Sequence, residues 1–133
     1  MENKQSYQLL NIILLESFFK RVADISSEQE AQKKISIDIE NQQDENNRLF
    51  VALTLKYISE VSDKIEIEAS VKMLGVFSCP SDPNASIKDF AKINAPAILF
   101  PFVREHIATL SMKAGIEPIL LQPINFVQLA ENS

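Results

Sequence analysis

Hydrophobic and polar positions alternate along three consecutive segments of the chain. In the first segment Ile35, Ile37 and Ile39 are separated by single polar residues, and the same alternation runs through residues 49–57 and 65–73. A period of two is typical of strands that bury one face and leave the other in water. Only short polar breaks separate the three segments, so they are predicted to form an antiparallel meander.

The segment before the meander, residues 7–21, is apolar on both parities. Leu10, Ile12, Leu14 and Phe18 share one parity, whereas Leu9, Ile13, Leu15 and Phe19 share the other. A helix and a strand covered on both faces are both compatible with this pattern. Residues 24–34 read as a polar connection, and residues 41–47 as a turn within the meander.

Helical signals follow the meander. Residues 86–93 are predicted to form a short helix, and a second helix is expected to begin at Asn94 or Ala95 and to end at Gly115. Pro96 suits a first helical turn and glycine suits the position just beyond a helix end. Pro101 should kink the second helix or mark its true start. The remaining tail is expected to be mostly extended.

Strands followed by helices indicate an α+β fold, and 133 residues suit a single domain over residues 1–133. A four-stranded sheet with a helix layer gives a thin core for so many apolar residues. The surplus in the first segment and in the tail therefore points to burial between subunits, or to a surface that binds apolar ligands.

Composition excludes several classes of function. The net charge is −5 and is concentrated between residues 24 and 72. An acidic surface repels phosphate, so no nucleic-acid partner is expected; this face is either simply solvated or a docking surface for a basic partner. With two glycines in the chain, a glycine-rich phosphate loop or dinucleotide fingerprint is excluded as well.

A single cysteine, Cys79, cannot form an internal disulfide, which favours a reducing compartment and a cytoplasmic protein. The apolar run of residues 9–15 is interrupted by Asn11 and lacks a small-residue cleavage site, so it does not read as a signal peptide. Nothing approaches the run of about 18 apolar residues that a membrane span needs. Membrane insertion is therefore not expected.

Catalytic and metal sites find little support in the sequence. One histidine, His106, and one cysteine cannot supply the four nitrogen or sulfur ligands of structural zinc, so no metal is expected. His106 lies on the apolar stripe of the second helix and reads as a core or interface histidine. We therefore expect a binding module without cofactor rather than an enzyme. A small-ligand enzyme or carrier that uses Cys79 and His106 is the remaining alternative.

Three motifs resemble the SecB family of protein-export chaperones. The first is Asn-Ala-Pro-Ala-Ile-Leu-Phe-Pro-Phe-Val-Arg-Glu-His-Ile at residues 94–107, where the family opens its long helix with an aliphatic-Leu-Phe-Pro-aromatic segment and a nearby Arg-Glu pair. The second is Gln-Pro-Ile-Asn-Phe at residues 122–126, and the third is Gly-Val-Phe at residues 75–77. Their order and spacing agree with the family from about Tyr7 to Leu129.

The resemblance implies a four-stranded antiparallel sheet followed by a helix layer. Because seven residues follow Phe126, the C-terminal helix is expected to be shortened to about one turn. It further implies a homotetramer, built as a dimer of dimers, that captures unfolded polypeptides without ATP. Preproteins held in this way would be delivered to SecA. The alternative is a SecB-like chaperone dedicated to one client, such as an antitoxin, without SecA docking.

Alignment with the family also names candidate site residues. Those for client binding are Ile35, Ile37, Ile39, Leu120, Phe126 and Leu129, for each of which ordinary core packing is the competing interpretation. Candidates for SecA docking are Glu16 and Glu68, which keep the acidic character of the family's docking face. Lys20 and Ser70 stand where acidic residues are expected on that face.

Overall fold

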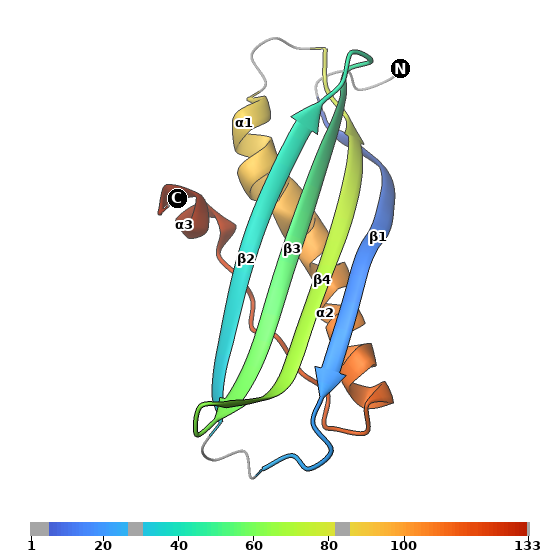
Figure 1. The fold of residues 1–133 in the computed structure, drawn as a ribbon. Coiled ribbons are helices and arrows are strands. Elements are labelled where there is room, and N and C mark those ends of the chain that lie inside the picture. Colours follow the sequence, from blue (N-terminus) through green and yellow to red (C-terminus); the bar gives the residue numbers. More distant parts are fainter. Residues whose placement is uncertain (1–5, 27–30, 82–85, 133) are drawn as a thin grey trace.

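The computed structural model describes residues 6–26, 31–81 and 86–132. Four strands come first in the chain and helices follow (Figure 1). The strands are β1 (Gln8–Arg21), β2 (Gln32–Gln43), β3 (Arg48–Val61) and β4 (Lys64–Ser78), and the helices are α1 (Ile87–Asp89), η2 (Phe90–Asn94), α2 (Ala95–Lys113) and α3 (Phe126–Glu131). The sheet is antiparallel with the order β1-β4-β3-β2. The predicted α+β fold and the short C-terminal helix are confirmed.

The meander forms where the alternation predicts it. Leu53 of β3 pairs with Ile39 of β2 on one side and with Met73 of β4 on the other. Strand β2 runs on to Gln43 through the first part of the predicted turn, because backbone pairing with β3 does not depend on the polar side chains there. Ser62 and Asp63 both have positive φ, as a two-residue hairpin between β3 and β4 requires.

The first segment forms a strand, β1, rather than a helix, and the alternation of its side chains between the two faces of the sheet is interrupted twice. The register against β4 shifts between Leu9 and Asn11 and again between Leu14 and Glu16. A bulge places two residues opposite one, so every later side chain changes face. The simple division of β1 into two faces by parity is therefore wrong: Leu14 and Ser17 both lie opposite inner-face residues of β4.

The helices after the sheet run together rather than as two separate pieces. Between Ile87 and Lys113 the backbone passes from α1 through the π-helix η2 into α2 without a break. Pro101 lies inside α2, so its interpretation as the helix start is wrong. A proline in a helix removes the hydrogen bond to the carbonyl four residues earlier, here that of Ala97, which is exposed and can bond water instead.

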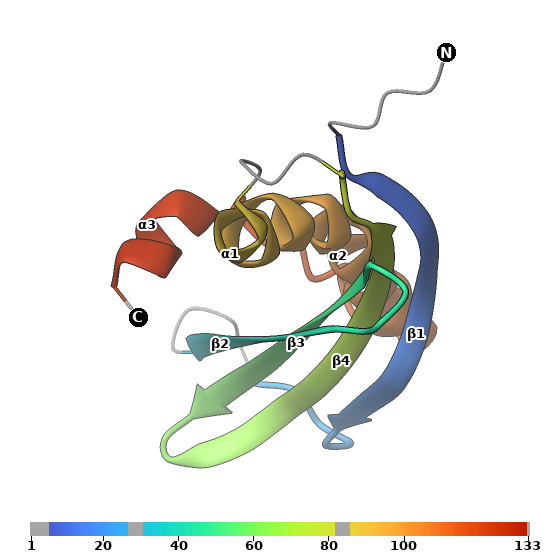
Figure 2. The same cartoon turned by 90° about the horizontal axis from the view of Figure 1, so that it is seen from above.

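The core lies between α2 and the inner face of the sheet (Figure 2). Leu99, Val103 and Ile107 of α2 are fully buried there. Helix α2 covers β4 and β3, whereas none of the helices in the described residues lies on the opposite, outer face of the sheet (Figures 1 and 2). The predicted polar connection between β1 and β2 lies partly outside the described residues, which resume at Ala31.

Candidate functional site

The inner face of the edge strand β2 is only partly covered. Ile35 is 48% exposed, and Ile37 and Ile39 are half-buried, whereas their partners on β3 are buried. Helix α2 crosses β3 and β4, and the β2 side is left to the linker (residues 114–125) and to α3, which lies beside β2 (Figures 1 and 2). The inward side chains and the backbone of β2 are therefore only partly covered by the rest of the protein.

Two cavities open along this edge. The first cavity, of about 360 Å³, lies between the lower half of β2, the linker and the connection between β1 and β2. The second cavity, of about 200 Å³, lies between β2 and α3. Apolar side chains line the first cavity together with the polar Lys33, Glu66 and Glu117. We call the two cavities, together with the β2 isoleucines that line them, the β2 groove.

The structure brings most of the predicted client-binding residues together in the β2 groove. Ile35 and Leu120 line the first cavity, and Ile37, Ile39 and Leu129 line the second. Leu120 is 74% exposed, so its side chain is accessible to a bound client. Ile35 in the first cavity and Ile39 in the second lie four residues, or about 13 Å, apart along the strand.

Phe126 lies outside the groove. It is 5% exposed and its ring packs edge-to-face on Phe100 of α2, with 6.0 Å between the ring centroids. Asn125 precedes it and caps α3 by accepting a hydrogen bond from the amide of Gln128 at 3.0 Å. Phe126 thus anchors α3 to the core, and through α3 it positions Leu129 on the second cavity.

Glu66 is a residue of the first cavity that the alternation pattern misplaces. The pattern predicts Ile65 inside and Glu66 in water, but the register between β3 and β4 shifts next to Glu60. This irregularity reverses the two positions, so Ile65 is 43% exposed and Glu66 only 5%. Nothing in the local sequence signals this shift, and Glu66 could not be predicted as a cavity residue.

Both oxygens of the buried Glu66 carboxylate accept hydrogen bonds. Its Oε2 accepts a hydrogen bond from the Ser26 hydroxyl at 2.6 Å, and its Oε1 accepts one from the Ser26 amide at 2.9 Å. These two bonds, first the hydroxyl and then the amide, hold the pKa of the Glu66 carboxyl below its usual range. The backbone carbonyl of Glu66 also accepts a bond from the Val22 amide at 2.9 Å.

Arg21 at the end of β1 binds both segments that lead into the first cavity. Its Nε donates to the Val22 carbonyl and its Nη2 to the Ala23 carbonyl, both at 2.9 Å. Its Nη1 donates to the carbonyl of Ala114, the C-cap of α2, at 2.7 Å. One guanidinium therefore joins the end of β1 to the start of the linker.

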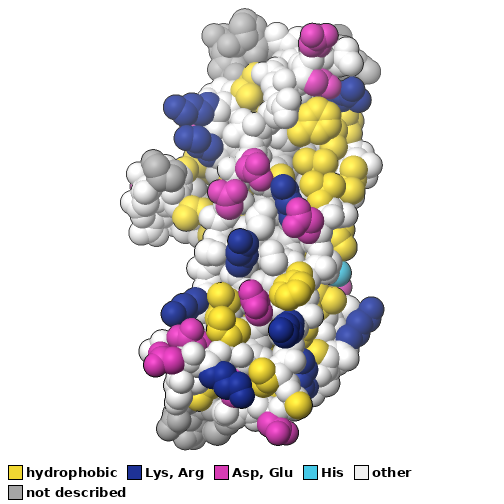
Figure 3. Space-filling model, in the orientation of Figure 1, with side chains coloured by type: hydrophobic (Ala, Val, Ile, Leu, Met, Phe, Trp, Pro, Cys, Tyr) yellow, Lys and Arg dark blue, Asp and Glu magenta, His cyan; other side chains and the backbone are white. Residues whose placement is uncertain are grey.

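Glu16 and Glu68 both lie on the outer face, where each faces a lysine across the strand pair. Glu16 pairs in register with Lys72, and Glu68 with Lys20. Figure 3 shows acidic and basic side chains interspersed over this face, with exposed hydrophobic side chains among them. Lys20, which stands where the resemblance leads us to expect an acid, thus lies directly opposite Glu68 in the sheet.

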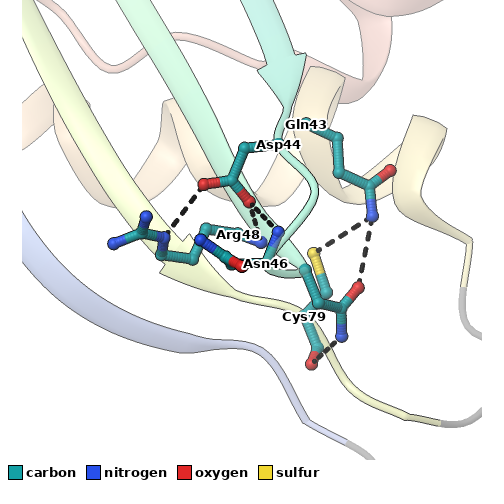
Figure 4. Close-up of polar contacts among 6 residues, drawn as sticks. Gln43, Asp44, Asn46, Arg48 and Cys79 are labelled. Atoms are coloured by element: carbon teal, nitrogen blue, oxygen red, sulfur yellow. Dashed lines mark hydrogen bonds and ion pairs between the residues drawn. The ribbon is translucent and has the colours of Figure 1, made fainter.

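Cys79 and His106 lie far apart. His106 Nε2 is 2.8 Å from the Ser17 hydroxyl, and Ser17 pairs with Val71, which is about 26 Å along the chain from Cys79 at strand spacing. Cys79 instead lies beside the β2–β3 turn (Figure 4). Its carbonyl accepts a hydrogen bond from Asn47 Nδ2 at 3.1 Å. Burial and the nearby Asp44 carboxylate raise the pKa of the Cys79 thiol, opposite to what a nucleophile needs.

Two further findings concern metals and membranes. Within the described residues, no three histidine, cysteine or acidic side chains come together as metal ligands would. Among the helices that the structure describes, none is long and apolar enough to cross a membrane.

Comparison with known proteins decides the family. The family model described as preprotein translocase subunit SecB matches residues 16–133. The chain belongs to the SecB family. Its relatives in that family include the protein-export protein SecB of Methylobacillus flagellatus, 32% identical over 98 residues, which cover 72% of this chain and 62% of that protein. The SecB of Anaplasma phagocytophilum is 41% identical over 91 residues, or 62% of this chain and 58% of that protein.

The SecB-family chain thus spans about three fifths of the length of these relatives. Among solved structures it resembles a SecB-like chaperone of Mycobacterium tuberculosis in complex with a peptide from the HigA1 antitoxin. The TM-score is 0.78 at 14% identity, and the match covers 90% of this chain and 91% of that one. This likeness establishes the fold of the SecB-like sheet and helix layer.

Proposed function

We propose that this SecB-family protein is an ATP-independent chaperone that holds unfolded polypeptides in its β2 groove, with preproteins for Sec-dependent export as clients. The observation that carries the proposal is the edge strand β2, whose half-exposed isoleucines open onto two cavities. Family membership supports the same function. The activity needs no catalytic residue.

An unfolded client would bind as an extended segment. The free edge of β2 offers backbone N–H and C=O groups that a further strand can pair with, and same-parity side chains of the client can enter the two cavities. Each apolar contact contributes about 25 cal/mol per Å² covered, less the cost of ordering the client. Binding is therefore tolerant of sequence, and folded proteins, whose apolar segments are already buried, are ignored.

The oligomer in this proposal is a homotetramer built as a dimer of dimers. Among the described residues outside the β2 groove, exposed apolar side chains include Leu10, Leu14 and Leu15 on β1 and Ile98, Phe102 and Met112 on α2. Their burial between copies would give the assembly its main driving force. A client that reaches several subunits gains avidity because each further contact forms at high effective concentration.

Docking to SecA is part of the export proposal, and Glu16 and Glu68 are its candidate residues. The lysines opposite them in the sheet weaken an acidic docking face. This observation favours a second candidate function, a chaperone dedicated to one client such as an antitoxin, without SecA docking. The absence of measurable binding to SecA would exclude export and leave the second candidate.

The test of the groove compares two isoleucines that are similarly exposed. Ile35→Ser alters the first cavity, and the matched control Ile65→Ser alters the outer face. We expect Ile35→Ser to weaken binding of a fluorescently labelled unfolded polypeptide by about fivefold and Ile65→Ser to leave it unchanged, because one apolar contact is worth roughly 1 kcal/mol. Fluorescence anisotropy measures both. A wild-type protein that ignores unfolded polypeptide would overturn the proposal.

A further inference from the structure

We infer that Arg21 and Glu66 are positioning residues of the first cavity: they hold its two irregular walls in the client-binding arrangement without lining it as apolar contacts. The inference rests on the proposed function, because it concerns the affinity of that same groove. The inference goes beyond the proposed function because it assigns a role to two charged residues whose side chains form hydrogen bonds within the protein.

The first cavity has walls of unequal kinds. Strands β2, β3 and β4 supply one side, and their geometry is set by the sheet. The other side consists of the connection after β1 and the linker after α2, and the described residues there, 22–26 and 116–122, are neither helix nor strand. Segments without a backbone ladder depend on side-chain hydrogen bonds for a fixed position.

Arg21 fixes the point where the linker begins. The last carbonyls of a helix lack intrahelical partners and carry partial negative charge, so a guanidinium is a favourable partner for Ala114. The same guanidinium holds Val22 and Ala23 through its other two nitrogens. A lysine cannot repeat this arrangement, because a single ammonium nitrogen cannot span three carbonyls on two segments.

Glu66 fixes the connection from the sheet side. The irregular register of β4 turns its carboxylate inward to Ser26, which lines the cavity, and both oxygens are used. The two anchors meet at Val22, whose carbonyl is held by Arg21 and whose amide is held by the backbone of Glu66. Linker, connection and sheet thus form one frame around the first cavity.

A preformed cavity binds more tightly than one that must be ordered on binding. Neither residue belongs to the buried apolar cluster under α2, so their loss should loosen the walls while the sheet and α2 persist. We therefore expect Arg21→Met and Glu66→Ala each to raise Kd by about tenfold, the scale expected when the support of a binding site is lost. Arg21→Lys should recover only part of the affinity.

The chain offers matched controls at the other end of the sheet. Arg48 and Asp44 bind one another across the β2–β3 turn, and Asp44 also accepts from the amides of Asn46 and Arg48. Arg48→Met and Asp44→Ala remove the same chemical groups as the two test variants, but far from the first cavity. Both controls should keep Kd within about twofold of wild type if the effect is local.

The experiment uses a fluorescein-labelled synthetic peptide of 20 residues with two phenylalanines four residues apart in its centre, so that both face the groove when the peptide is extended. Kd is measured by anisotropy at a temperature well below the unfolding midpoint of every variant, so that global destabilisation does not contribute. A photo-crosslinking residue placed at Ile35 or at Ile39 reports on each cavity separately. Crosslinking from position 35 should fall in both test variants while crosslinking from position 39 persists.

The outcomes separate the inference from the proposed function. Wild-type protein that does not bind the peptide contradicts the proposed function itself. Wild-type binding with unchanged Kd in Arg21→Met and Glu66→Ala contradicts the positioning role alone. An equal loss in test and control variants, or an equal loss of crosslinking at both positions, assigns the residues a merely structural role and also overturns the inference.

Discussion

At the scale of single residues, Gly75 determines how closely α2 can approach the sheet. A Cβ added at this position would lie 2.8 Å from Leu99 Cδ2 of α2 and 2.8 Å from Phe77 Cε1. Both neighbours are almost completely buried, so neither can move into solvent. The glycine is required here for close packing rather than for a special backbone conformation.

Gly75→Ala should therefore destabilise the protein, although alanine loses less backbone entropy than glycine on folding. Overpacking of a filled core typically costs about 1–3 kcal/mol. The midpoint of urea unfolding, followed by circular dichroism, measures the change. In a double-mutant cycle, Leu99→Ala should relieve part of the cost because it removes one of the two clashing groups. A more stable Gly75→Ala protein would show that α2 does not approach β4 this closely.

Glu66 predicts a specific response to acid. Its ionised carboxylate is bound by Ser26 in the folded state, which lowers its pKa relative to the unfolded chain. The stability that it contributes is therefore complete above the unfolded pKa of about 4.3 and is lost as pH falls through the lower, folded value. We expect the urea midpoint of wild-type protein to fall more steeply below pH 4.5 than that of Glu66→Gln.

Asp44 must be separated from this effect, because hydrogen bonds from Arg48 and Asn46 also hold the pKa of its carboxyl below the usual range. Asp44→Asn should also make the urea midpoint less dependent on pH. The effects of the two substitutions on the midpoint should be additive, because the two sites are far apart. If Glu66→Gln and wild type show the same acid profile, the Ser26 bonds do not favour the charged carboxyl.

At the scale of elements, the regular parts were predictable and the irregular ones were not. Alternation identifies β2, β3 and β4 because each buries one face, and the proline and glycine positions bracket α2. The register shifts in β1 and beside Glu66 have no local sequence signature, since tertiary contacts set them. They place Phe18 on the face opposite to Leu14 and turn Ile65 outward, which is why parity alone misassigns these side chains.

The same limit applies to the candidate site. The family motifs pointed to apolar positions of β2 and the tail, and the structure gathers Ile35, Leu120 and Leu129 on the β2 groove. The pattern could not show that Phe126 is core, because core and groove positions are equally apolar. Nothing in the sequence singles out Arg21 and Glu66, because the fold alone brings their partners, Ala114 and Ser26, within reach.

The C-terminal end of α2 gives a prediction at the element scale. Gly115 has a φ of +76°. Its amide donates a hydrogen bond to the Met112 carbonyl, and the Ile116 amide donates one to the Ser111 carbonyl, so the two bonds form a Schellman motif. Gly115→Ala should cost about 1 kcal/mol of unfolding free energy from the left-handed backbone alone. A Cβ there has room, since its nearest neighbour is Arg21 Nη1 at 3.9 Å.

Gly115→Asn is the control for that prediction, because asparagine tolerates the left-handed region better than alanine. Its urea midpoint should lie between those of wild type and Gly115→Ala. Equal midpoints for alanine and asparagine would show that the cost arises from contacts of the added side chain and not from φ.

At the scale of the whole molecule, the strand order separates two surfaces. With the order β1-β4-β3-β2, the exposed apolar residues of β1 lie at one edge of the sheet and the β2 groove at the other (Figure 1). An assembly through β1 and α2 therefore leaves the β2 groove open to clients. In the proposed tetramer, substitutions on β1 and substitutions in the β2 groove should therefore affect oligomer formation and client binding separately.

Leu15→Lys tests this separation. Leu15 lies at the second bulge of β1 and is exposed in the single chain, so a lysine there should leave the fold intact but place a charge in the proposed interface. Light scattering after size exclusion should show a mass near four subunits of 15.0 kDa for wild type and a smaller mass for the variant. Ile65 is similarly exposed but lies on the outer face, so Ile65→Lys is the control and should keep the wild-type mass.

Client affinity of the Leu15→Lys protein then separates avidity from the groove itself. A 20-residue peptide occupies one groove, so its Kd should stay within about twofold of wild type, whereas a long unfolded chain that reaches several subunits should bind about tenfold more weakly or worse. If the short peptide is lost together with the oligomer, the client site lies at β1 and α2, or depends on a neighbouring subunit, and the β2 groove of a single chain is not sufficient. If neither affinity changes while the mass falls, one groove holds the whole client and the assembly serves another purpose.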